Sequence, residues 1–450
     1  MLYNQYIILR RQRNSSMATN YEKLIEQINN GELDERFAAV YGRDGLEAGK
    51  RRMLRTAEGF RFASTVADDT PIALYSAPGR TEIGGNHTDH QNGKVLCASV
   101  DLDMTACAAP NGTQHIHIVS PGYRDVDIEL DDLEPKNMER YESAGLVRGI
   151  AFKIRELGFE PKGFDANIAS EVKSGSGLSS SAAYEVLVGN IMNHICCSDS
   201  LTAEQIAKIG QFAENEYFGK PCGLMDQMAS SVGGLVFIDF KDPESPVCEK
   251  LDCDFSKAGY ALCIAETDSG HANLSGEYAQ ITEEMRKVAE CFRKTKLREV
   301  EKEYFINSIS GLRKRCGDRA VLRALHFFEE EDRVDREKMA LEEGDFDSFL
   351  KTVTESGCSS AMWLQNTRSE GSIELQEVQV ALALAQELLG GRGAVRVHGG
   401  GFAGTIQAFV PEDMTREFAE KMELVFGART CHVLHIRPGG GCMVTEMNEN

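Results

Sequence analysis

Two periods of apolar residues alternate along the chain, and this alternation predicts a protein built from both strands and helices. Residues 71–77 and 94–109 are rich in apolar and β-branched side chains and predict strands, and residues 164–172 predict a short strand. Residues 145–158 place apolar side chains at helical spacing. Residues 394–410 predict two further strands around a glycine turn. No internal repeat and no low-complexity linker interrupts the pattern.

The length of the chain predicts two domains, because 450 residues exceed what one hydrophobic core usually fills. The boundary is expected near residues 250–260. The net charge of -21 argues against a nucleic-acid partner, since phosphate backbones bind to clustered Lys and Arg. An acidic protein can still hold a nucleotide ligand through backbone N–H groups.

The 13 cysteines are scattered, with no Cys-x-x-Cys pair and no cysteine–histidine array at zinc spacing, so we expect them to be reduced and mostly buried. The first residues hold an apolar run too short for a signal peptide, with the basic residues on its wrong side. We therefore expect residues 1–20 to be disordered, or to precede a true start at Met17, in a cytoplasmic protein. No run of about 18 apolar residues predicts a transmembrane helix.

The run "PGRTEIGGNHTDHQN" at residues 78–92 gathers ionisable side chains on a stretch that has neither a helical nor a strand period, and we expect a flexible loop there. These side chains are Arg80, Glu82, His87, Asp89 and His90. Such a cluster beside several glycines is a candidate polar binding site.

The run "KSGSGLSSSAA" at residues 173–183 predicts a glycine turn that opens a helix, with a strand leading into it. A helix N-terminus offers unpaired N–H groups and a partial positive charge to phosphate oxygens. The serine hydroxyls add donors, and one of them can also bind Mg²⁺. An ordinary serine cap remains the alternative. The run is neither a Walker A loop nor a G-x-G-x-x-G fingerprint.

Two further runs contain candidate chemistry. In residues 397–410, four glycines between two strands allow the backbone to approach another group closely. In residues 214–234, Asp226 follows a glycine turn and begins an apolar helix, where it is either functional or an ordinary first-turn acid. The acidic run at residues 329–332 is interpreted as a solvated helix surface rather than a metal site.

With these four runs in this order, the sequence resembles the galactokinase family of the GHMP kinase superfamily. The family signature G-R-V-N-L-I-G-E-H-T-D-Y is matched by "GRTEIGGNHTDH", and P-x-G-x-G-L-S-S-S-A by "KSGSGLSSSA". The aspartate motif E-x-E-x-x-G-x-x-C-G-I-M-D-Q is matched by "ENEYFGKPCGLMDQ", and G-G-G-F-G-G by "GGGFAG". The resemblance spans about residues 70 to 410.

The resemblance implies an α+β, two-domain GHMP kinase fold. Its N-terminal domain, residues 21–255, is expected to be ribosomal protein S5 domain 2-like and to bind sugar and ATP. Its C-terminal GHMP kinase domain, residues 256–450, is expected to be ferredoxin-like. The implied partners are a small-molecule sugar and ATP, with no nucleic acid, membrane or obligate protein partner.

The resemblance also implies an activity, the ATP-dependent phosphorylation of the C1 hydroxyl of galactose, with Asp226 facing that hydroxyl and Arg80 lying between it and the phosphates. The implied sugar-binding residues are Asn86, His87, Asp89, Gly223 and Tyr278. The implied ATP-binding residues are Gly175, Ser176, Gly177, Leu178, Ser179, Ser180 and Ser181. Ser181 and Glu214 are the implied ligands of Mg²⁺, which keeps several waters and needs few protein ligands.

Four positions depart from the family pattern: Lys173 replaces a proline, Glu82 an asparagine, Asn86 a glutamate and His90 a tyrosine. In galactokinases the glutamate accepts a hydrogen bond from the C6 hydroxyl, and its loss would favour a sugar with a C6 carboxylate. A galacturonate 1-kinase is therefore the second hypothesis, since plant galacturonate kinases also lack the glutamate, and an N-acetylgalactosamine kinase is the third. A catalytically silent sugar sensor is opposed by the complete serine run and by the presence of Arg80 and Asp226.

Overall fold

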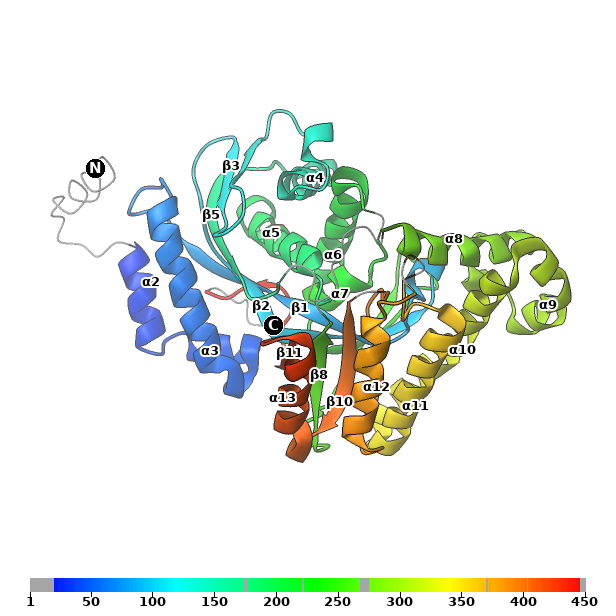
Figure 1. Cartoon of the computed structure of the whole chain (residues 1–450). Coiled ribbons are helices and arrows are strands. Elements are labelled where there is room, and N and C mark those ends of the chain that lie inside the picture. The colour runs from blue at the N-terminus through cyan, green and yellow to red at the C-terminus, as the bar shows by residue number, and fades with distance from the viewer. Residues whose placement is uncertain are drawn as a thin grey trace.

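Two β-sheets and the helices packed on them make up the fold of this computed structural model (Figure 1). The described residues are 20–173, 177–220, 222–267, 275–369, 371, 373–402 and 404–445. The expectation for residues 1–20 lies outside them except at Asn20, which begins a helix, and the ATP-binding predictions for Gly175 and Ser176 also lie outside them. Across the described residues, no helix combines the length and apolar character needed to cross a membrane.

The larger sheet has eight strands in the order β12-β1-β2-β5-β3-β4, with β6 between β2 and β7. Its strands are β1 Ala73–Gly84, β2 Lys94–Pro110, β3 His115–Val119, β4 Val126–Glu129, β5 Phe164–Ser170, β6 Leu235–Asp239, β7 Val247–Leu251 and β12 Cys442–Met443. The long strand β2 pairs with β6 through its first half and with β5 through its second half, and only β3 and β5 run parallel.

The smaller sheet is antiparallel, in the order β11-β8-β10-β9. Its strands are β8 Tyr260–Glu266, β9 Ala394–His398, β10 Thr405–Pro411 and β11 Cys431–Leu434. The strands predicted on either side of the glycine run are therefore present as β9 and β10.

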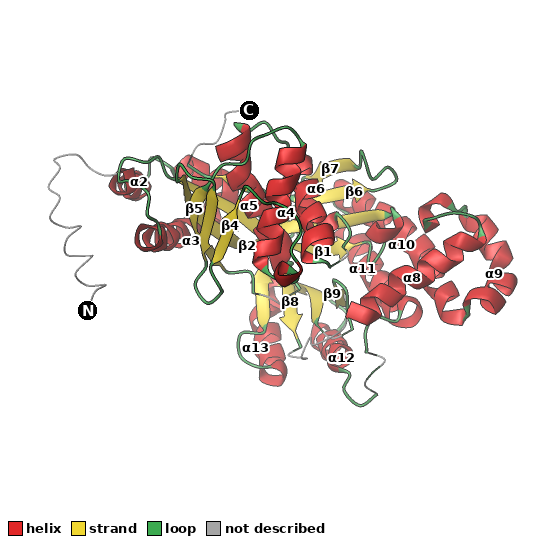
Figure 2. Ribbon diagram, turned by 90° about the horizontal axis from the view of Figure 1, so that it is seen from above, coloured by secondary structure: helices red, strands yellow, loops and turns green. Residues whose placement is uncertain are grey.

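Helices cover both faces of the larger sheet, as the view from above shows (Figure 2). The helices of this half are α2 Asn20–Asn29, α3 Asp34–Ala63, α4 Ser143–Glu156, α5 Ser180–Cys197, α6 Ala203–Phe212 and α7 Met225–Val232. Side chains alternate between the faces of a strand, so Tyr75 and Ala106 join the core beneath α5, whereas Leu74 and Cys107 join the core beneath α3.

The remaining helices belong to the second half of the chain. They are α8 Ser275–Cys291, α9 Lys302–Cys316, α10 Asp318–Glu343, α11 Phe346–Ser359, α12 Glu377–Leu389 and α13 Thr415–Phe426. Helices α12 and α13 cover one face of the smaller sheet. Phe349 of α11 and Ile264 of β8 belong to the same core as the larger sheet, so the two sheets share one continuous hydrophobic interior.

The predicted strands and the predicted helix at residues 145–158 are confirmed, but the prediction of a flexible loop over residues 78–92 was wrong for its first half. Strand β1 continues to Gly84, so Arg80 and Glu82 lie on a strand. The β1–β2 pairing shifts register before Arg80 and again after Glu82. Such bulges interrupt the regular alternation and redirect side chains, which is why the sequence showed no period there.

A buried polar cluster ties the C-terminal segment to the larger sheet. Asp103 accepts hydrogen bonds from Arg437 Nη1 (3.1 Å) and from the Tyr41 hydroxyl (2.8 Å), and its other oxygen lies 3.0 Å from Arg52 Nε. Arg437 Nη1 also donates to Ser76 Oγ at 2.6 Å. Because Asp103 and Arg437 are each only 1% exposed, their charges depend on one another for solvation.

Replacing Asp103 by Asn should lower the free energy of unfolding by about 3–5 kcal/mol, since it leaves buried guanidinium groups without their carboxylate. Chemical denaturation of purified protein measures this loss. Asp125→Asn, a change at an exposed position, is the control and should shift the free energy of unfolding by less than about 0.5 kcal/mol. A loss as small in Asp103→Asn would show that this cluster does not hold the tail.

Candidate functional site

A cavity of about 1730 Å³ gathers side chains from all four sequence runs. The predicted site residues that line it are Arg80, His87, Asp89, Gly177, Ser179, Ser180, Ser181, Glu214, Gly223, Asp226 and Tyr278. Two other predicted site residues, Leu178 and Asn86, are buried and do not line the cavity. The cavity therefore brings most of the predicted residues together from positions almost 200 residues apart.

Arg80 and Asp226, which both line this cavity, form a bidentate ion pair. Arg80 Nε lies 2.6 Å from one carboxylate oxygen of Asp226, and Nη2 lies 2.7 Å from the other. The third nitrogen, Nη1, donates to the carbonyl of Gly177 at 2.5 Å. Paired, parallel hydrogen bonds fix the relative orientation of a guanidinium and a carboxylate. The Asp226 carboxylate is therefore held in one orientation.

Asp226 stays ionised in this position. Burial alone would raise the pKa of its carboxyl, but the Arg80 guanidinium and the Ser179 hydroxyl, which donates to Asp226 at 2.7 Å, lower the pKa below its usual value. The Arg80 pKa is raised, because the attraction of Asp226 outweighs the effect of burial. A carboxylate and a guanidinium thus face each other fully charged beside the cavity.

The serine run lies where helix α5 begins. Gly177 and Ser179 both have left-handed backbone angles, with φ of 76° and 57°, and α5 starts at Ser180. The N–H groups of its first turn have no partner within the helix and carry a partial positive charge. This end of the cavity therefore suits phosphate oxygens, as the sequence predicts.

Ser181 and Glu214 lie side by side on this wall. The Ser181 hydroxyl donates to Glu214 Oε1 at 2.9 Å, and Lys220 Nζ lies 3.0 Å from the same oxygen. A hydroxyl and a carboxylate are the oxygen donors that Mg²⁺ prefers. Within the described part of the chain, no group of three or more His, Cys, Asp and Glu side chains could hold a metal ion. A metal here would depend on few protein ligands.

Asp89 lies on the opposite wall, in the short helix Asp89–Gln91, and Gly223 makes room for it. A Cβ atom at Gly223 would overlap Asp89 Oδ2, so only glycine leaves space for this carboxylate. Burial, and then the nearby charge of Asp226, raise the pKa of Asp89 to about 6. Asp89 Oδ1 accepts from the N–H of His90 at 2.8 Å, and the carboxylate lines the cavity, where it can also accept a hydrogen bond from a ligand hydroxyl.

The glycine run between β9 and β10 closes the cavity. His87 Nε2 lies 3.1 Å from the carbonyl of Gly400, and the Tyr278 hydroxyl donates to the carbonyl of Gly401 at 3.3 Å. A Cβ atom at Gly400 would overlap the Tyr278 ring, and Gly401 has a φ of 79°. The glycines are therefore needed for close approach as well as for turning the chain.

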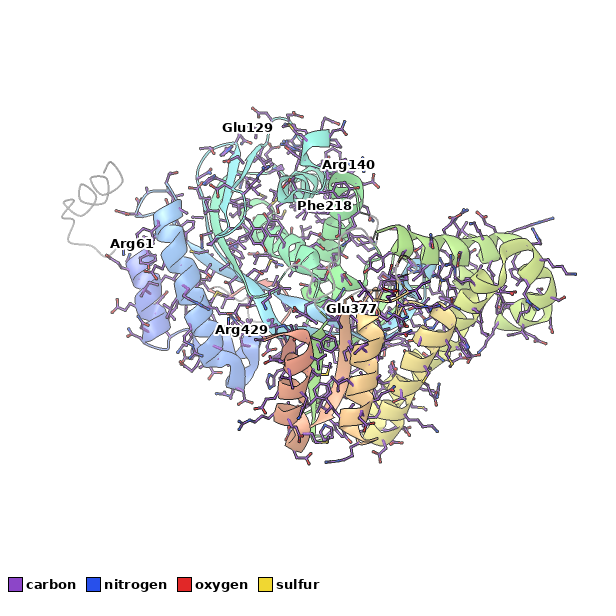
Figure 3. All side chains as sticks on the ribbon, viewed as in Figure 1. Arg61, Glu129, Arg140, Phe218, Glu377 and Arg429 are labelled. Atoms are coloured by element: carbon purple, nitrogen blue, oxygen red, sulfur yellow. The ribbon has the colours of Figure 1, made fainter. Side chains whose placement is uncertain are left out.

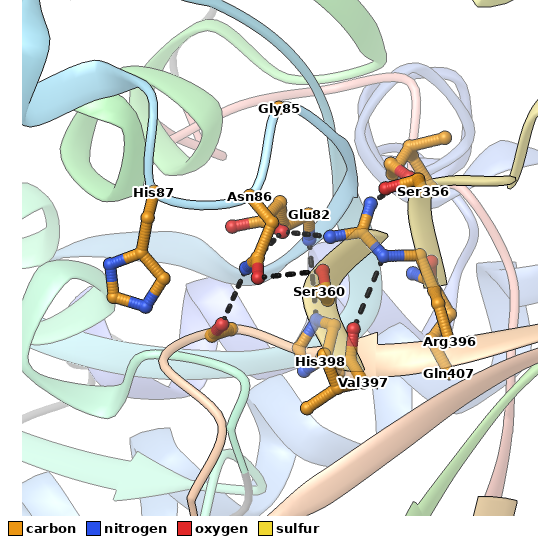
Figure 4. Close-up of polar contacts among 12 residues, drawn as sticks. Glu82, Gly85, Asn86, His87, Ser356, Ser360, Arg396, Val397, His398 and Gln407 are labelled. Carbon is orange, nitrogen blue, oxygen red and sulfur yellow. Dashed lines mark hydrogen bonds and ion pairs between the residues drawn. The ribbon is translucent and has the colours of Figure 1, made fainter. Parts of the chain in front are cut away.

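Asn86 is buried beside the loop at His87 and does not line the cavity, although the resemblance implied that its amide lies toward C6 of the sugar (Figure 4). Its Nδ2 donates to Glu82 Oε1 at 2.9 Å and to the carbonyl of Gly399 at 2.7 Å. Its Oδ1 accepts from Asn366 Nδ2 at 2.8 Å and from Ser360 Oγ at 3.2 Å. These four bonds use the full capacity of an amide, so none is left for a ligand.

Glu82, for which the sequence suggested no role, does line the cavity. It lies two residues after Arg80 on β1, and its carboxylate is bonded to the amide of Asn86 and paired with the buried Arg396. Burial raises the pKa of Glu82 to about 7, although Arg396 and Arg80 pull it down. The carboxylate that the family pattern places at position 86 is thus carried here by the neighbouring side chain at position 82.

The interpretation of residues 329–332 as a solvated surface was wrong for two of them. They do lie on helix α10, but Glu330 is fully buried against the loop at Gly85, and Glu331 is paired with Arg298. The signal that could have revealed this is the spacing of His326, Glu330, Arg333 and Glu337, which places four polar residues on one helix face. All four are buried.

Replacing Gly223 by Ala should displace the Asp89 carboxylate and weaken sugar binding by tenfold or more, which is about 1.4 kcal/mol, while the fold persists. Isothermal calorimetry with galactose, next to a thermal melt, measures both effects. Gly276→Ala is the control, because a Cβ atom there meets no other atom within 4 Å. Unchanged affinity in Gly223→Ala would show that Asp89 does not contact the sugar.

Comparisons with known proteins agree with this arrangement. The model of the GHMP kinases N terminal domain matches residues 145–234, and the galactokinase galactose-binding signature matches residues 61–110. The first match contains the serine run and Asp226, and the second contains Arg80 and the loop at His87. The two matches therefore meet in the cavity, where Arg80 pairs with Asp226 and Asp89 lies against Gly223.

Solved structures show the same fold. Galactokinase from Lactococcus lactis, complexed with galactose, superposes with a TM-score of 0.73 at 23% identity, covering 87% of this chain and 98% of that one. Mevalonate kinase from Methanococcus jannaschii gives 0.58 at 14% identity, covering 81% and 98%. The D-glycero-D-manno-heptose 1-phosphate kinase from Bacteriodes thetaiotaomicron gives 0.55 at 15% identity, covering 84% and 100%. The fold is the mixed α/β GHMP kinase fold, and the match of both models to the chain supports the galactokinase family of the GHMP kinase superfamily.

Proposed function

We propose that this protein transfers the γ-phosphoryl group of ATP to the C1 hydroxyl of galactose, giving galactose 1-phosphate. The observation that carries the proposal is the Arg80–Asp226 ion pair, which lies between the serine run on one wall and Asp89 on the other. A phosphoryl donor held by the serine run and a sugar held near Asp89 would meet at this pair.

Asp226 and Arg80 have complementary tasks in this reaction. A sugar hydroxyl is a weak nucleophile, so a carboxylate that stays ionised can orient it and take its proton during the transfer. Arg80 keeps the pKa of Asp226 low and offsets negative charge as the phosphoryl group moves. Ser179 holds the second oxygen of Asp226, which leaves the carboxylate little freedom to turn away.

The other end of the cavity fits the base of a nucleotide. Tyr141 and Phe218 pack edge to face there with ring centroids 5.7 Å apart, and Leu146 and Ile168 add aliphatic surface. Figure 3 shows Phe218 and Arg140 on neighbouring segments beside α4. We assign this apolar wall to the adenine ring, because a purine offers a flat face for stacking on aromatic side chains.

Mg²⁺ is proposed to bind between the phosphates and the pair Ser181 and Glu214. When bound, the ion neutralises charge on the β- and γ-phosphates. Lys220 lies beside Glu214 and would add a second positive charge near the phosphate oxygens. Removal of divalent metal by a chelator should therefore abolish turnover.

Galacturonate is the second candidate substrate, and two observations bear on it. The loss of the glutamate at position 86 was the reason to consider it, but the Glu82 carboxylate now occupies that neighbourhood and would repel an acidic sugar. In its favour, Lys296 lines the same end of the cavity, with its ammonium donating to the carbonyl of His90 at 2.7 Å. Asp89 adds a second carboxylate beside Lys296, so a neutral sugar is favoured over an acidic one.

A coupled ATP-consumption assay with Mg²⁺ and separate galactose, galacturonate and N-acetylgalactosamine tests the proposal, with phosphorus NMR to locate the new phosphate. We expect turnover on galactose and a phosphate at C1. Asp226→Asn should lower kcat by a factor on the order of 10²–10⁴ while galactose still binds. Binding of galactose and ATP without turnover in the unmodified protein would instead support the sensor hypothesis.

Replacing Glu82 by Gln should raise the ratio of kcat/KM for galacturonate to that for galactose by about tenfold, because it removes a negative charge from the sugar end. In the unmodified protein the same ratio should rise as the pH falls through about 7, since Glu82 with its raised pKa then takes up a proton. In Glu82→Gln the change near pH 7 should be lost, and only the change near pH 6 that Asp89 causes should remain.

Glu142→Gln, which removes a charge from the wall assigned to the adenine ring, is the matched control and should leave the substrate ratio unchanged within about twofold. If Glu82→Gln also leaves the ratio unchanged, Glu82 does not discriminate between these sugars.

A further inference from the structure

The loop that presents His87 and Asp89 has an unfavourable backbone conformation. His87 has a φ of 60°, in the left-handed region that residues with a side chain seldom adopt. Gly85 has a φ of 89°, and a Cβ atom there would lie 2.5 Å from the carbonyl oxygen of Lys94. Such a conformation persists only where surrounding groups hold it in place.

Those groups come from a distant part of the chain. Glu330 Oε1, on helix α10, accepts hydrogen bonds from the N–H of Gly85 at 3.2 Å and from the N–H of Asn86 at 3.3 Å. His326 Nε2, one turn earlier on the same helix, bonds to the carbonyl of Asn86 at 2.9 Å. Helix α10 therefore holds both ends of the peptide that leads into His87.

Glu330 is itself fixed in place. It is fully buried, and it accepts from Arg333 Nε at 2.6 Å and from the Ser356 hydroxyl at 2.6 Å. Burial alone would raise the pKa of Glu330, but Arg333 and the other positive groups around it lower the pKa to about 2. Four donors from three segments thus converge on one ionised carboxylate.

His326 is oriented by the same surroundings. Burial lowers the pKa of His326 to about 4, so the ring is neutral. Arg333 Nη2 donates to Ser359 Oγ at 2.8 Å, which leaves the Ser359 hydroxyl hydrogen for His326 Nδ1, also at 2.8 Å. With Nδ1 accepting, the proton is on Nε2, which is the form that donates to the carbonyl of Asn86.

We propose that Glu330 is a positioning residue for sugar binding, acting through the N–H groups of Gly85 and Asn86 to aim His87 and Asp89 into the cavity. The inference rests on the proposed function, since it assigns these two side chains to the sugar. The phosphate end of the cavity is built by α5, α7 and the start of the serine run. The hydrogen bonds of Glu330 go instead to the loop at Gly85, to Arg333 and to Ser356. Loss of Glu330 should therefore affect the sugar and spare ATP.

The experiment compares steady-state kinetics of the full chain and of Glu330→Gln. A glutamine that keeps its oxygen toward the loop turns its NH₂ group against the Arg333 guanidinium, and the flipped amide turns the NH₂ group against the loop N–H groups. Either orientation therefore loses part of the hydrogen bonding that holds the loop. We expect the KM for galactose to rise about tenfold and the KM for ATP to stay within about twofold. Calorimetric titration with galactose should show the same loss of affinity.

Asp332→Asn is the matched control, because it removes a charge from the same acidic run at an exposed position and should leave both KM values unchanged. A purely structural role for Glu330 would lower the melting temperature and the fraction of active enzyme, which reduces the apparent kcat and leaves the galactose KM unaltered. That outcome would overturn the proposal.

Glu330→Asp provides a second variant in case the glutamine protein does not fold. It keeps the charge beside Arg333 but is one methylene too short to reach the loop, so the galactose KM should again rise. An unchanged galactose KM in a folded Glu330→Asp protein contradicts the proposal. Absence of galactose turnover in the unmodified protein would instead contradict the proposed function, so the two failures are distinguishable.

Discussion

The ion pair between Arg80 and Asp226 is the interaction on which the geometry of the site depends. It joins strand β1 to helix α7, and through the Gly177 carbonyl and the Ser179 hydroxyl it also fixes the turn that opens α5. Arg80 is buried, so loss of the Asp226 carboxylate would leave a guanidinium without its partner in a poorly solvated position. One contact therefore ties together three elements that line the cavity.

Much of the fold and part of the site could be predicted from the sequence, because local patterns encode local structure. Alternation and helical spacing predicted β1, β2, α4 and β5, and the glycine and serine runs predicted the turn before α5. The motifs placed Arg80 and Asp226 in one site. The sequence could not show where their side chains point, because the bulges of β1 break the alternation that would otherwise assign Arg80 and Glu82 to a face of the sheet.

The contacts missed by the sequence analysis are those between segments far apart in the chain. Asn86 was expected in the cavity because it stands at a sugar-binding position of the family motif, yet its amide is bonded to Glu82, Ser360, Asn366 and Gly399. Glu330 was interpreted as part of a solvated surface because charge runs usually are. In both cases a partner more than 200 residues away decided the outcome, and no local rule contains that information.

The loop at residues 85–89 depends on helix α10 and on the glycine run, and this dependence also has a consequence for synthesis of the protein. Strand β1 and the loop after it leave the ribosome long before residues 326 to 401, and early domains generally fold first. Until those later residues have emerged, Gly85 and Asn86 lack the groups that hold them, so the loop at His87 cannot yet take its final conformation. Contacts of such long sequence separation form late and slowly, so this wall of the cavity is expected to be among the last parts of the molecule to be completed.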